Sequence, residues 1–314
     1  MSENPGKSRF AIPALLFVVV AALCIFLYIF LVKHQSRKIN ALTISEGPDS
    51  ATITRWDVTP HGNKNVAYTV FKDSNIWKIK LHDNTVADAD LVIIARSLKH
   101  LSKFKNMIHV QLDKSGWKAE KFDNDSGTRI TIYTGNKVAG SYIVSKLEFI
   151  DQYKSSYYIR PVNSDSVYQI TETYLDGSVM AKEENFRKKI LVPVDPSYYK
   201  RVRIVSADTN VYYLLENVNG RWSINGREID QRKVLTYLKM LTLLQIPHFA
   251  VERVKNRPEA SVLIDTKFGP ITLTASKEQN GKWVMASSVN VGNRLELTLP
   301  QINAIFPPFY FFMP

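Results

Sequence analysis

The sequence contains a single cysteine, Cys24, among its 314 residues. Because no cysteine follows it, the rest of the chain has no disulfide framework, which excludes the small, disulfide-stapled classes of secreted protein. A thiol nucleophile is excluded from the same part of the chain. Cys24 raises the question of a lipid-modified cysteine, but Leu23 does not suit a lipobox and the apolar sequence continues beyond it. We therefore expect Cys24 to lie within a membrane helix.

Long runs of like charge are also missing. The formal net charge is +12, yet no five consecutive residues carry charges of one sign. A basic surface can attract anionic lipid headgroups, an acidic polymer or nucleic acid. Scattered charges are more typical of a solvated surface, so we expect no nucleic-acid partner.

Motifs of catalysis and metal binding are absent as well. The zinc-binding spacings do not occur around any histidine. The histidines are His34, His61, His82, His100, His109 and His248. No G-x-S-x-G motif and no glycine-rich phosphate loop is present. Residues 123–127 open like a calcium loop, but Thr134 stands where a bidentate glutamate is needed, which favours a polar turn. We expect no cofactor, no metal ion and no enzymatic activity.

One long apolar run is present. Residues 10–32 are 23 consecutive residues without a charge, and about 20 apolar residues suffice for a helix to cross a bilayer. The run has no small-residue cleavage site, so we expect an uncleaved anchor rather than a signal peptide. Basic residues flank it on both sides and do not decide its orientation. The short segment 1–9 favours a cytoplasmic tail, with everything after Val32 in a bacterial periplasm.

Beyond a polar stalk at residues 33–50, the chain alternates between two kinds of pattern. Short stretches of alternating β-branched, aromatic and polar residues are typical of strands. Apolar residues recur at helical spacing after Asp90 and again after Asp230, and each aspartate is placed to cap a first helical turn. The sequence thus predicts an α+β protein in which each half is an antiparallel sheet packed with one main helix.

The two halves resemble each other in sequence. NVAYTVFKDSNIW aligns with NVYYLLENVNGRW and pairs Trp77 with Trp222, at an offset of 145 residues. DLVIIARSLKHL aligns with DQRKVLTYLKML and pairs Leu98 with Leu238, at an offset of 140 residues. We interpret this as a domain duplication. The predicted organisation is a cytoplasmic tail at 1–9, a transmembrane helix at 10–32, a stalk at 33–50 and two α+β repeats at 51–195 and 196–314.

The matched positions predict the structural residues of these repeats. They are Trp77, Asp90, Leu98, Trp222, Asp230 and Leu238. A tryptophan on a strand can serve as a stacking platform for a sugar or a base. Recurrence at matched positions favours a core residue beneath the amphipathic helix, where burial of the ring stabilises the fold.

Further stretches of the chain resemble a known family. After the tryptophan strand and the LKxL helix come YTGNKVAGSYIV, SSYYIRPVNSDSVYQI and FRKKILVPVDPSYYKRVRIV. Over residues 51–314 this order is similar to a bacterial family of membrane-anchored proteins, domain-of-unknown-function family 4340. The resemblance implies an envelope protein with an N-terminal membrane helix and a repeated domain, whose relatives are associated with transporter-like systems. It implies no catalytic residues.

The chain ends in an aromatic segment, FPPFYFFMP. Its five aromatic residues are Phe306, Phe309, Tyr310, Phe311 and Phe312. Chain ends are usually polar and frayed. The segment therefore either folds back over a sheet edge as an extended strap or docks on another protein.

Together these features predict a non-enzymatic, single-span protein of the bacterial inner membrane. Its role would be that of a scaffold or an accessory component of a membrane transport or assembly complex. The expected partners are the inner membrane, through residues 10–32, and a membrane protein; nothing in the sequence indicates the oligomeric state. The alternative is a periplasmic ligand-binding module for lipid or anionic glycan.

Overall fold

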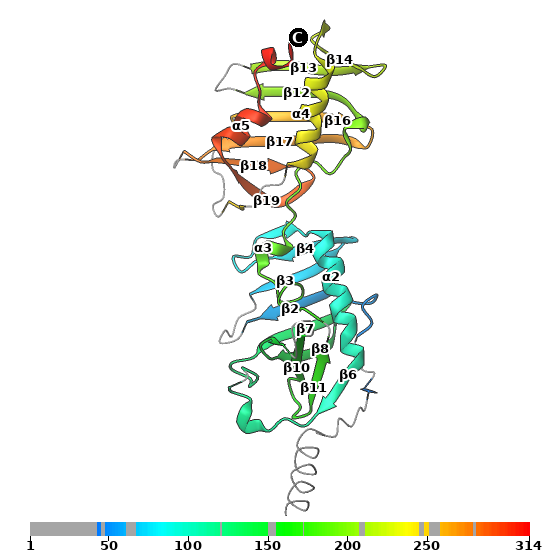
Figure 1. Ribbon diagram of the computed structural model, residues 1–314, viewed down its shortest axis with the longest axis vertical. Helices are drawn as coiled ribbons and strands as arrows, with labels where there is room; N and C mark the ends of the chain where they lie inside the picture. Colours follow the sequence, from blue (N-terminus) through cyan, green and yellow to red (C-terminus); the bar gives the residue numbers. More distant parts are fainter. Residues whose placement is uncertain are drawn as a thin grey trace, which may run out of the picture.

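Two antiparallel β-sheets follow one another along the chain and along the long axis of the molecule (Figure 1). The computed structural model describes residues 43–44, 48–60, 67–119, 121–149, 155–171, 173–206, 211–244, 248–250, 258–278 and 281–314. The predicted tail at 1–9 and the predicted membrane helix at 10–32 lie outside these residues. Within the described part of the chain, every helix is too short or too polar to cross a membrane.

The first sheet contains eleven strands. They are β1 (Thr43–Ile44), β2 (Arg55–Thr59), β3 (Tyr68–Asp73), β4 (Ile76–Lys80), β5 (Val86–Asp88), β6 (Met107–Val110), β7 (Thr128–Thr134), β8 (Lys137–Val144), β9 (Glu148–Phe149), β10 (Ser155–Pro161) and β11 (Val167–Thr171). Their order is β1-β6-β11-β10-β8-β7-β2-β3-β4-β5, with β9 beside β10. The hairpins β2–β3 and β3–β4 place Trp56 opposite Val70 and Val70 opposite Ile79, so these three side chains share one face.

The second sheet contains eight strands. They are β12 (Tyr199–Ser206), β13 (Val211–Val218), β14 (Arg221–Ile224), β15 (Arg227–Glu228), β16 (Ala260–Thr266), β17 (Gly269–Lys277), β18 (Trp283–Ser287) and β19 (Asn290–Leu297). Their order is β15-β14-β13-β12-β16-β17-β18-β19. Eight strands of the first sheet have the order β5-β4-β3-β2-β7-β8-β10-β11. Numbered along the chain, this is the same order as that of the eight strands of the second sheet.

The helices are few and short. They are α2 (Leu91–Leu101), α3 (Glu183–Phe186), α4 (Gln231–Leu243) and α5 (Leu299–Ile305), with the 3-10 helices η1 (Ser102–Asn106), η2 (Lys114–Gly116), η3 (Pro196–Tyr198) and η4 (Phe309–Phe312). The predicted α+β class is therefore wrong, because the described residues are mostly antiparallel sheet with few helices. The two amphipathic helical patterns received too much weight. The alternating stretches that follow α2 join the first sheet, and those that follow α4 join the second sheet. In both halves of the chain the strand residues outnumber the helical residues.

Each sheet buries one of its faces beneath helices. In the first sheet, Trp56 and Ile79 pack in one cluster with Ile94 of α2. In the second sheet, strand β16 alternates strictly between buried and partly exposed residues, and its inward side chains share a core with Leu238 of α4. The alternation of side chains along the strands gives each sheet one buried face, and the helical repeat of 3.6 residues gives each helix the apolar face that packs against it. The opposite faces remain largely polar.

The two sheets meet where β5 lies against β19. The Val291 amide donates to the Asp88 carboxylate at 3.0 Å, and the Asn293 amide group donates to the Asp88 carbonyl at 2.9 Å. Arg187 Nε donates to Asn293 Oδ1 at 2.9 Å, and its guanidinium lies 3.8 Å from the ring centre of Phe249. Burial lowers the pKa of Arg187, and the hydrogen bond to Asn293 with the ring of Phe249 offsets part of the cost of burying its charge. This junction holds the two sheets end to end.

Replacing Gly292 with alanine should weaken the junction. Gly292 has a φ of 77°, and a Cβ atom there would lie 2.0 Å from the carbonyl oxygen of Val86. Because the obstacle is backbone, we expect Gly292→Ala to lower the free energy of unfolding by about 2–4 kcal/mol. Urea denaturation checks it. Gly220→Ala is the matched control, since Gly220 has a φ of 85° and open space around it. Equal losses in the two variants would mean that the close approach to Val86 contributes nothing.

Candidate functional site

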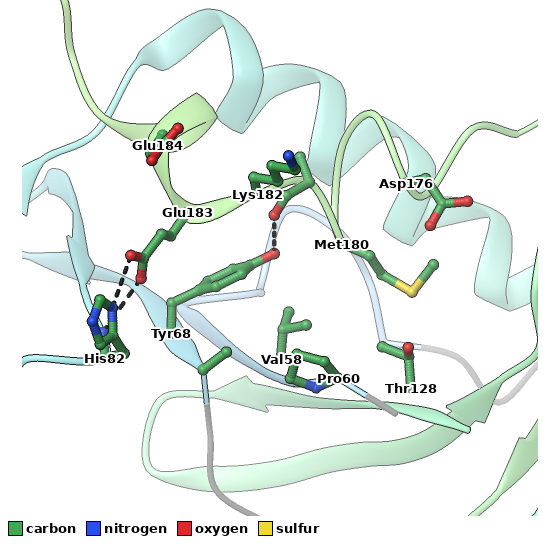
Figure 2. A pocket seen from close by; sticks show the side chains of 12 residues that line it. Val58, Pro60, Tyr68, His82, Thr128, Asp176, Met180, Lys182, Glu183 and Glu184 are labelled. Atoms are coloured by element: carbon green, nitrogen blue, oxygen red, sulfur yellow. Dashed lines mark hydrogen bonds and ion pairs between the residues drawn. The ribbon is translucent and has the colours of Figure 1, made fainter. Parts of the chain in front are cut away.

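A pocket of about 420 Å³ opens beside the first sheet, between strands β2 and β3 and the segment 176–184 (Figure 2). It is lined by Val58, Pro60, Ala67, Tyr68, His82, Thr128, Asp176, Met180, Ala181, Lys182, Glu183 and Glu184. Its volume lies within the range of small-molecule sites, and its lining combines an apolar part with several charged side chains.

Tyr68 forms the floor of the pocket and supports its wall. The alternation of β3 turns Tyr68 and Val70 inward. The Tyr68 hydroxyl donates to the carbonyl oxygens of Val179 and Ala181, at 3.1 Å and 2.6 Å. Burial, with the charges of Glu183 and Asp176, raises the pKa of Tyr68 well above its usual value. The hydroxyl is therefore a fixed hydrogen-bond donor that holds the wall in place.

Charged groups surround the pocket. Glu183 is bound to His82 twice, through Nδ1 at 2.9 Å and through the backbone amide at 3.3 Å (Figure 2). Asp176, Glu184 and Lys182 complete the charged lining. With three carboxylates, the pocket favours a ligand that has a cationic end and an apolar body. It disfavours an anionic ligand.

A serine–histidine pair lies on the same side of the first sheet. His100 Nδ1 is 2.6 Å from Ser178 Oγ, a distance typical of a nucleophile and its base. Ser178 is fully buried, however, and its hydroxyl donates to the carbonyl oxygen of Tyr174 at 2.8 Å. The Ser178 hydroxyl is thus held between the imidazole and a backbone carbonyl. The pair ties α2 to the segment that walls the pocket.

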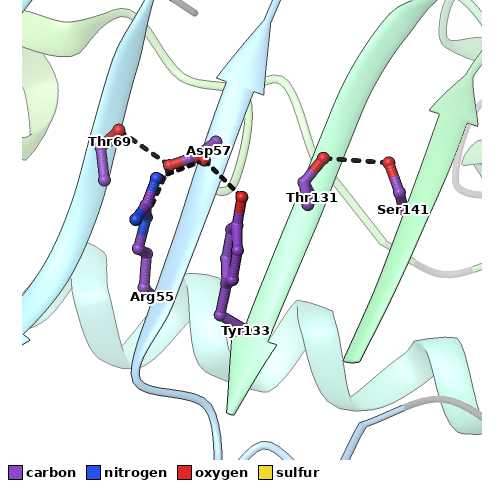
Figure 3. Close-up of polar contacts among 6 residues, drawn as sticks. All are labelled: Arg55, Asp57, Thr69, Thr131, Tyr133 and Ser141. Carbon is purple, nitrogen blue, oxygen red and sulfur yellow. Dashed lines mark hydrogen bonds and ion pairs between the residues drawn. The ribbon is translucent and has the colours of Figure 1, made fainter. Parts of the chain in front are cut away.

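The open face of the first sheet carries a polar network (Figure 3). Asp57 accepts hydrogen bonds from Arg55 at 2.7 Å and 3.0 Å, from Thr69 at 2.8 Å and from Tyr133 at 2.9 Å. Burial, followed by the hydrogen bond to Asp57, raises the pKa of Tyr133. With four donors on its two oxygens, the Asp57 carboxylate is saturated. The network holds neighbouring strands together and leaves no free lone pair for a substrate proton.

The segment 123–127 forms a turn closed by its own side chain. Asp123 Oδ1 accepts from the backbone amides of Asp125 and Ser126, at 2.9 Å and 2.7 Å. Arg160, which is 3 % exposed, donates to Asn124 Oδ1 at 2.6 Å. The aspartate, asparagine and glycine of this segment therefore form a turn, and Arg160 stabilises the turn through its hydrogen bond to Asn124. Across the described residues, no group of three His, Cys, Asp or Glu side chains is placed to hold a metal ion.

The two tryptophans predicted as structural differ in burial. Trp222 is 4 % exposed and belongs to the core beneath α4. Its backbone is joined to Gln231 by two hydrogen bonds of 2.9 Å and 2.8 Å. Trp77 is only partly buried and lies 5.6 Å from Trp56, measured between ring centres.

The remaining structural residues lie in α2 and α4 or at their first turns. Asp90 accepts from the Val92 amide at 2.8 Å. Asp230 accepts from the amides of Arg232 and Lys233, at 2.8 Å and 3.3 Å. Leu238 is fully buried, and Leu98 is partly buried against the first core. These residues cap the two helices or pack them on the sheets, and they line no part of the pocket.

The aromatic C-terminal segment is half anchored and half exposed. Phe306 and Phe312 are buried in the second core. Phe309, Tyr310 and Phe311 are exposed by 50 %, 68 % and 43 %. The segment forms the short helix η4, which begins after Pro308 and ends at the buried Phe312, rather than an extended strap. The three exposed rings are thus presented on a fixed backbone.

Residues that build the pocket were missed by the sequence interpretation. Tyr68, His82 and Glu183 lie far apart in the chain, and the segment 176–184 has no periodic pattern. The one sequence feature that set the segment 176–184 apart was its position between the two halves of the chain.

Comparison with known proteins places the chain in a family without assigning an activity. No curated protein and no solved structure matches the chain. The family model described as Domain of unknown function (DUF4340) matches residues 77–263, which include β4, the pocket wall, the link between the sheets and α4. The chain belongs to this family of domains of unknown function.

Proposed function

We propose that this protein is a scaffold, a non-enzymatic component of a membrane transport or assembly complex in the bacterial envelope. It is attached to the inner membrane through residues 10–32, and its two sheets lie in the periplasm. A membrane protein is its partner.

The junction between the sheets is the observation that carries this proposal. Asp88, Asn293 and Arg187 join the sheets through hydrogen bonds of 2.9–3.0 Å. Lys188 adds a further bond to the carbonyl oxygen of Val289 at 2.9 Å. These bonds, with Gly292 packed closely against the backbone of Val86, favour a fixed relative orientation of the two sheets over the free motion of domains on a linker. A fixed orientation is what a spacer between two partners requires.

Two further observations support a scaffold over an enzyme or an anionic-ligand module. The Ser178 hydroxyl is fully buried, and the lone pairs of Asp57 already accept structural hydrogen bonds. The pocket is lined by Asp176, Glu183 and Glu184, which repel an anionic glycan or lipid headgroup.

Purification of the full-length chain in a mild detergent tests the proposal. We expect a membrane protein to be recovered in a constant ratio to the chain. Gly292→Ala should reduce this recovery, because it disturbs the junction, while Gly220→Ala should not. A chain that carries tightly bound lipid or glycan and no protein partner would instead support the ligand-binding alternative.

A further inference from the structure

Helix α2 and the adjoining η1 carry basic residues and no acidic ones. Residues 91–106 contain no Asp and no Glu. Arg96 and Lys99 are exposed, and Lys103 is partly exposed. The ion pairs formed by described residues involve none of these three cations. We call Arg96, Lys99 and Lys103 the basic end of α2.

The basic end is a cluster, because Arg96, Lys99 and Lys103 are spaced three and four residues apart, which places them on one helical face. His100 has its pKa lowered first by burial and then by the charges of Lys99, Arg96 and Lys103. The three cations therefore all lie close enough to His100 to lower its pKa. Lys78 on β4 is by contrast paired with Asp73.

The basic end lies beside the point where the described chain begins. Strand β1 pairs with β6, and β6 directly follows η1. Only ten residues, 33–42, separate the apolar run from β1. Ten residues span at most about 35 Å when fully extended. The C-terminus lies at the opposite end of the molecule (Figure 1).

We propose that the basic end of α2 binds anionic lipid headgroups at the surface of the membrane that holds residues 10–32. The inference rests on the membrane attachment in the proposed function. Unpaired cations within reach of a bilayer are attracted by its anionic phospholipids. Binding there would hold the first sheet against the membrane and point the second sheet away from it. An acidic protein segment would be a different partner, and the experiment below separates the two.

Fluorescence quenching by labelled lipid tests the proposal. The full-length Cys24→Ser chain carries one new cysteine, Ala95→Cys, labelled with a fluorophore; Ala95 is exposed between Leu91 and Lys99. The chain is reconstituted into phosphatidylcholine vesicles that contain a headgroup-attached nitroxide quencher, with or without phosphatidylglycerol. We expect strong quenching with phosphatidylglycerol and weak quenching without it. Each cation near the surface should shift the docked population by about fivefold.

Charge reversal and a distant label are the controls. Arg96→Glu with Lys99→Glu should abolish the effect of phosphatidylglycerol, whereas Lys72→Glu with Lys80→Glu, an equal charge change on exposed residues of β3 and β4, should not. A label at Val218→Cys in the second sheet should remain unquenched. Quenching at residue 95 that ignores phosphatidylglycerol, or that responds equally to both charge reversals, would overturn the proposal and leave an acidic protein as the partner to seek.

Failure of the membrane attachment has a separate readout. A chain that does not float with neutral vesicles would contradict attachment through residues 10–32, and with it the proposed function. Flotation with anionic vesicles that depends on Arg96 and Lys99 would still support the basic end in that case. Its absence would overturn the inference as well.

Discussion

Deletion of residues 306–314 should lower the free energy of unfolding of the second sheet by more than about 5 kcal/mol. Phe306 and Phe312 are 6 % and 0 % exposed, and removal of one buried aromatic ring costs about 3–5 kcal/mol. The buried hydroxyl of Tyr213 would also lose its acceptor, the carbonyl oxygen of Pro307 at 2.6 Å. A buried hydroxyl without a partner costs about 1–3 kcal/mol more. The first turn of α4 would lose the bond from the Asp230 amide to the Phe312 carbonyl.

The exposed rings of the same segment provide the matched control. Phe309, Tyr310 and Phe311 replaced together by serine should cost clearly less stability than the truncation, about 1–3 kcal/mol, because these rings are each roughly half in water. Urea denaturation followed by circular dichroism measures both variants. If the truncated chain unfolds like the full chain, the segment is no part of the core. If the serine variant is stable yet loses a membrane partner, the exposed rings are a docking surface.

Local sequence patterns were sufficient to predict the local features of this fold. Asp90 and Asp230 stand one residue before the first residues of α2 and α4, because a short polar side chain satisfies the free amides of a first turn. Trp77 and Trp222 occupy equivalent places, opposite Lys72 and Asn217 in their hairpins. Such features depend on neighbours only a few residues away, so the sequence contains enough information to predict them.

The class of the fold depended on pairings that leave no local pattern. Strand β6 follows the first helix, yet it pairs with β11, about 60 residues later, and with β1. Register between distant strands is decided by which faces they bury together, not by either strand alone. The predicted α+β class failed for this reason, since the sequence showed the strands without showing how many would join one sheet.

The pocket and the junction were hidden from the sequence by the same cause. Tyr68 contacts the carbonyl oxygen of Ala181, 113 positions away, and Asn293 contacts Asp88 across 205 positions. The sequence shows a glycine at position 292, but it does not show that this glycine lies against the backbone of Val86. The proposed function rests on such a long-range placement, which is why the sequence alone predicted a scaffold without showing what joins its two sheets.

Trp222→Ala should destabilise the protein far more than Trp77→Ala. The ring of Trp222 is 4 % exposed in the second core, so its removal should cost about 3–5 kcal/mol. Trp77 is only partly buried at the edge of the first core. Since the loss scales with the apolar area that burial removes from water, we expect about 1–2 kcal/mol there.

Urea denaturation of the two alanine variants checks this difference, with Trp222→Phe and Trp77→Phe as controls that retain an aromatic ring. The phenylalanine at position 222 should recover most of the lost stability, because it refills most of the cavity that alanine leaves. Equal losses at both positions would mean that burial in the structure does not set the cost. An unchanged midpoint at both positions would contradict the core role and revive the stacking platform, since a ring that adds nothing to stability is retained for what it binds.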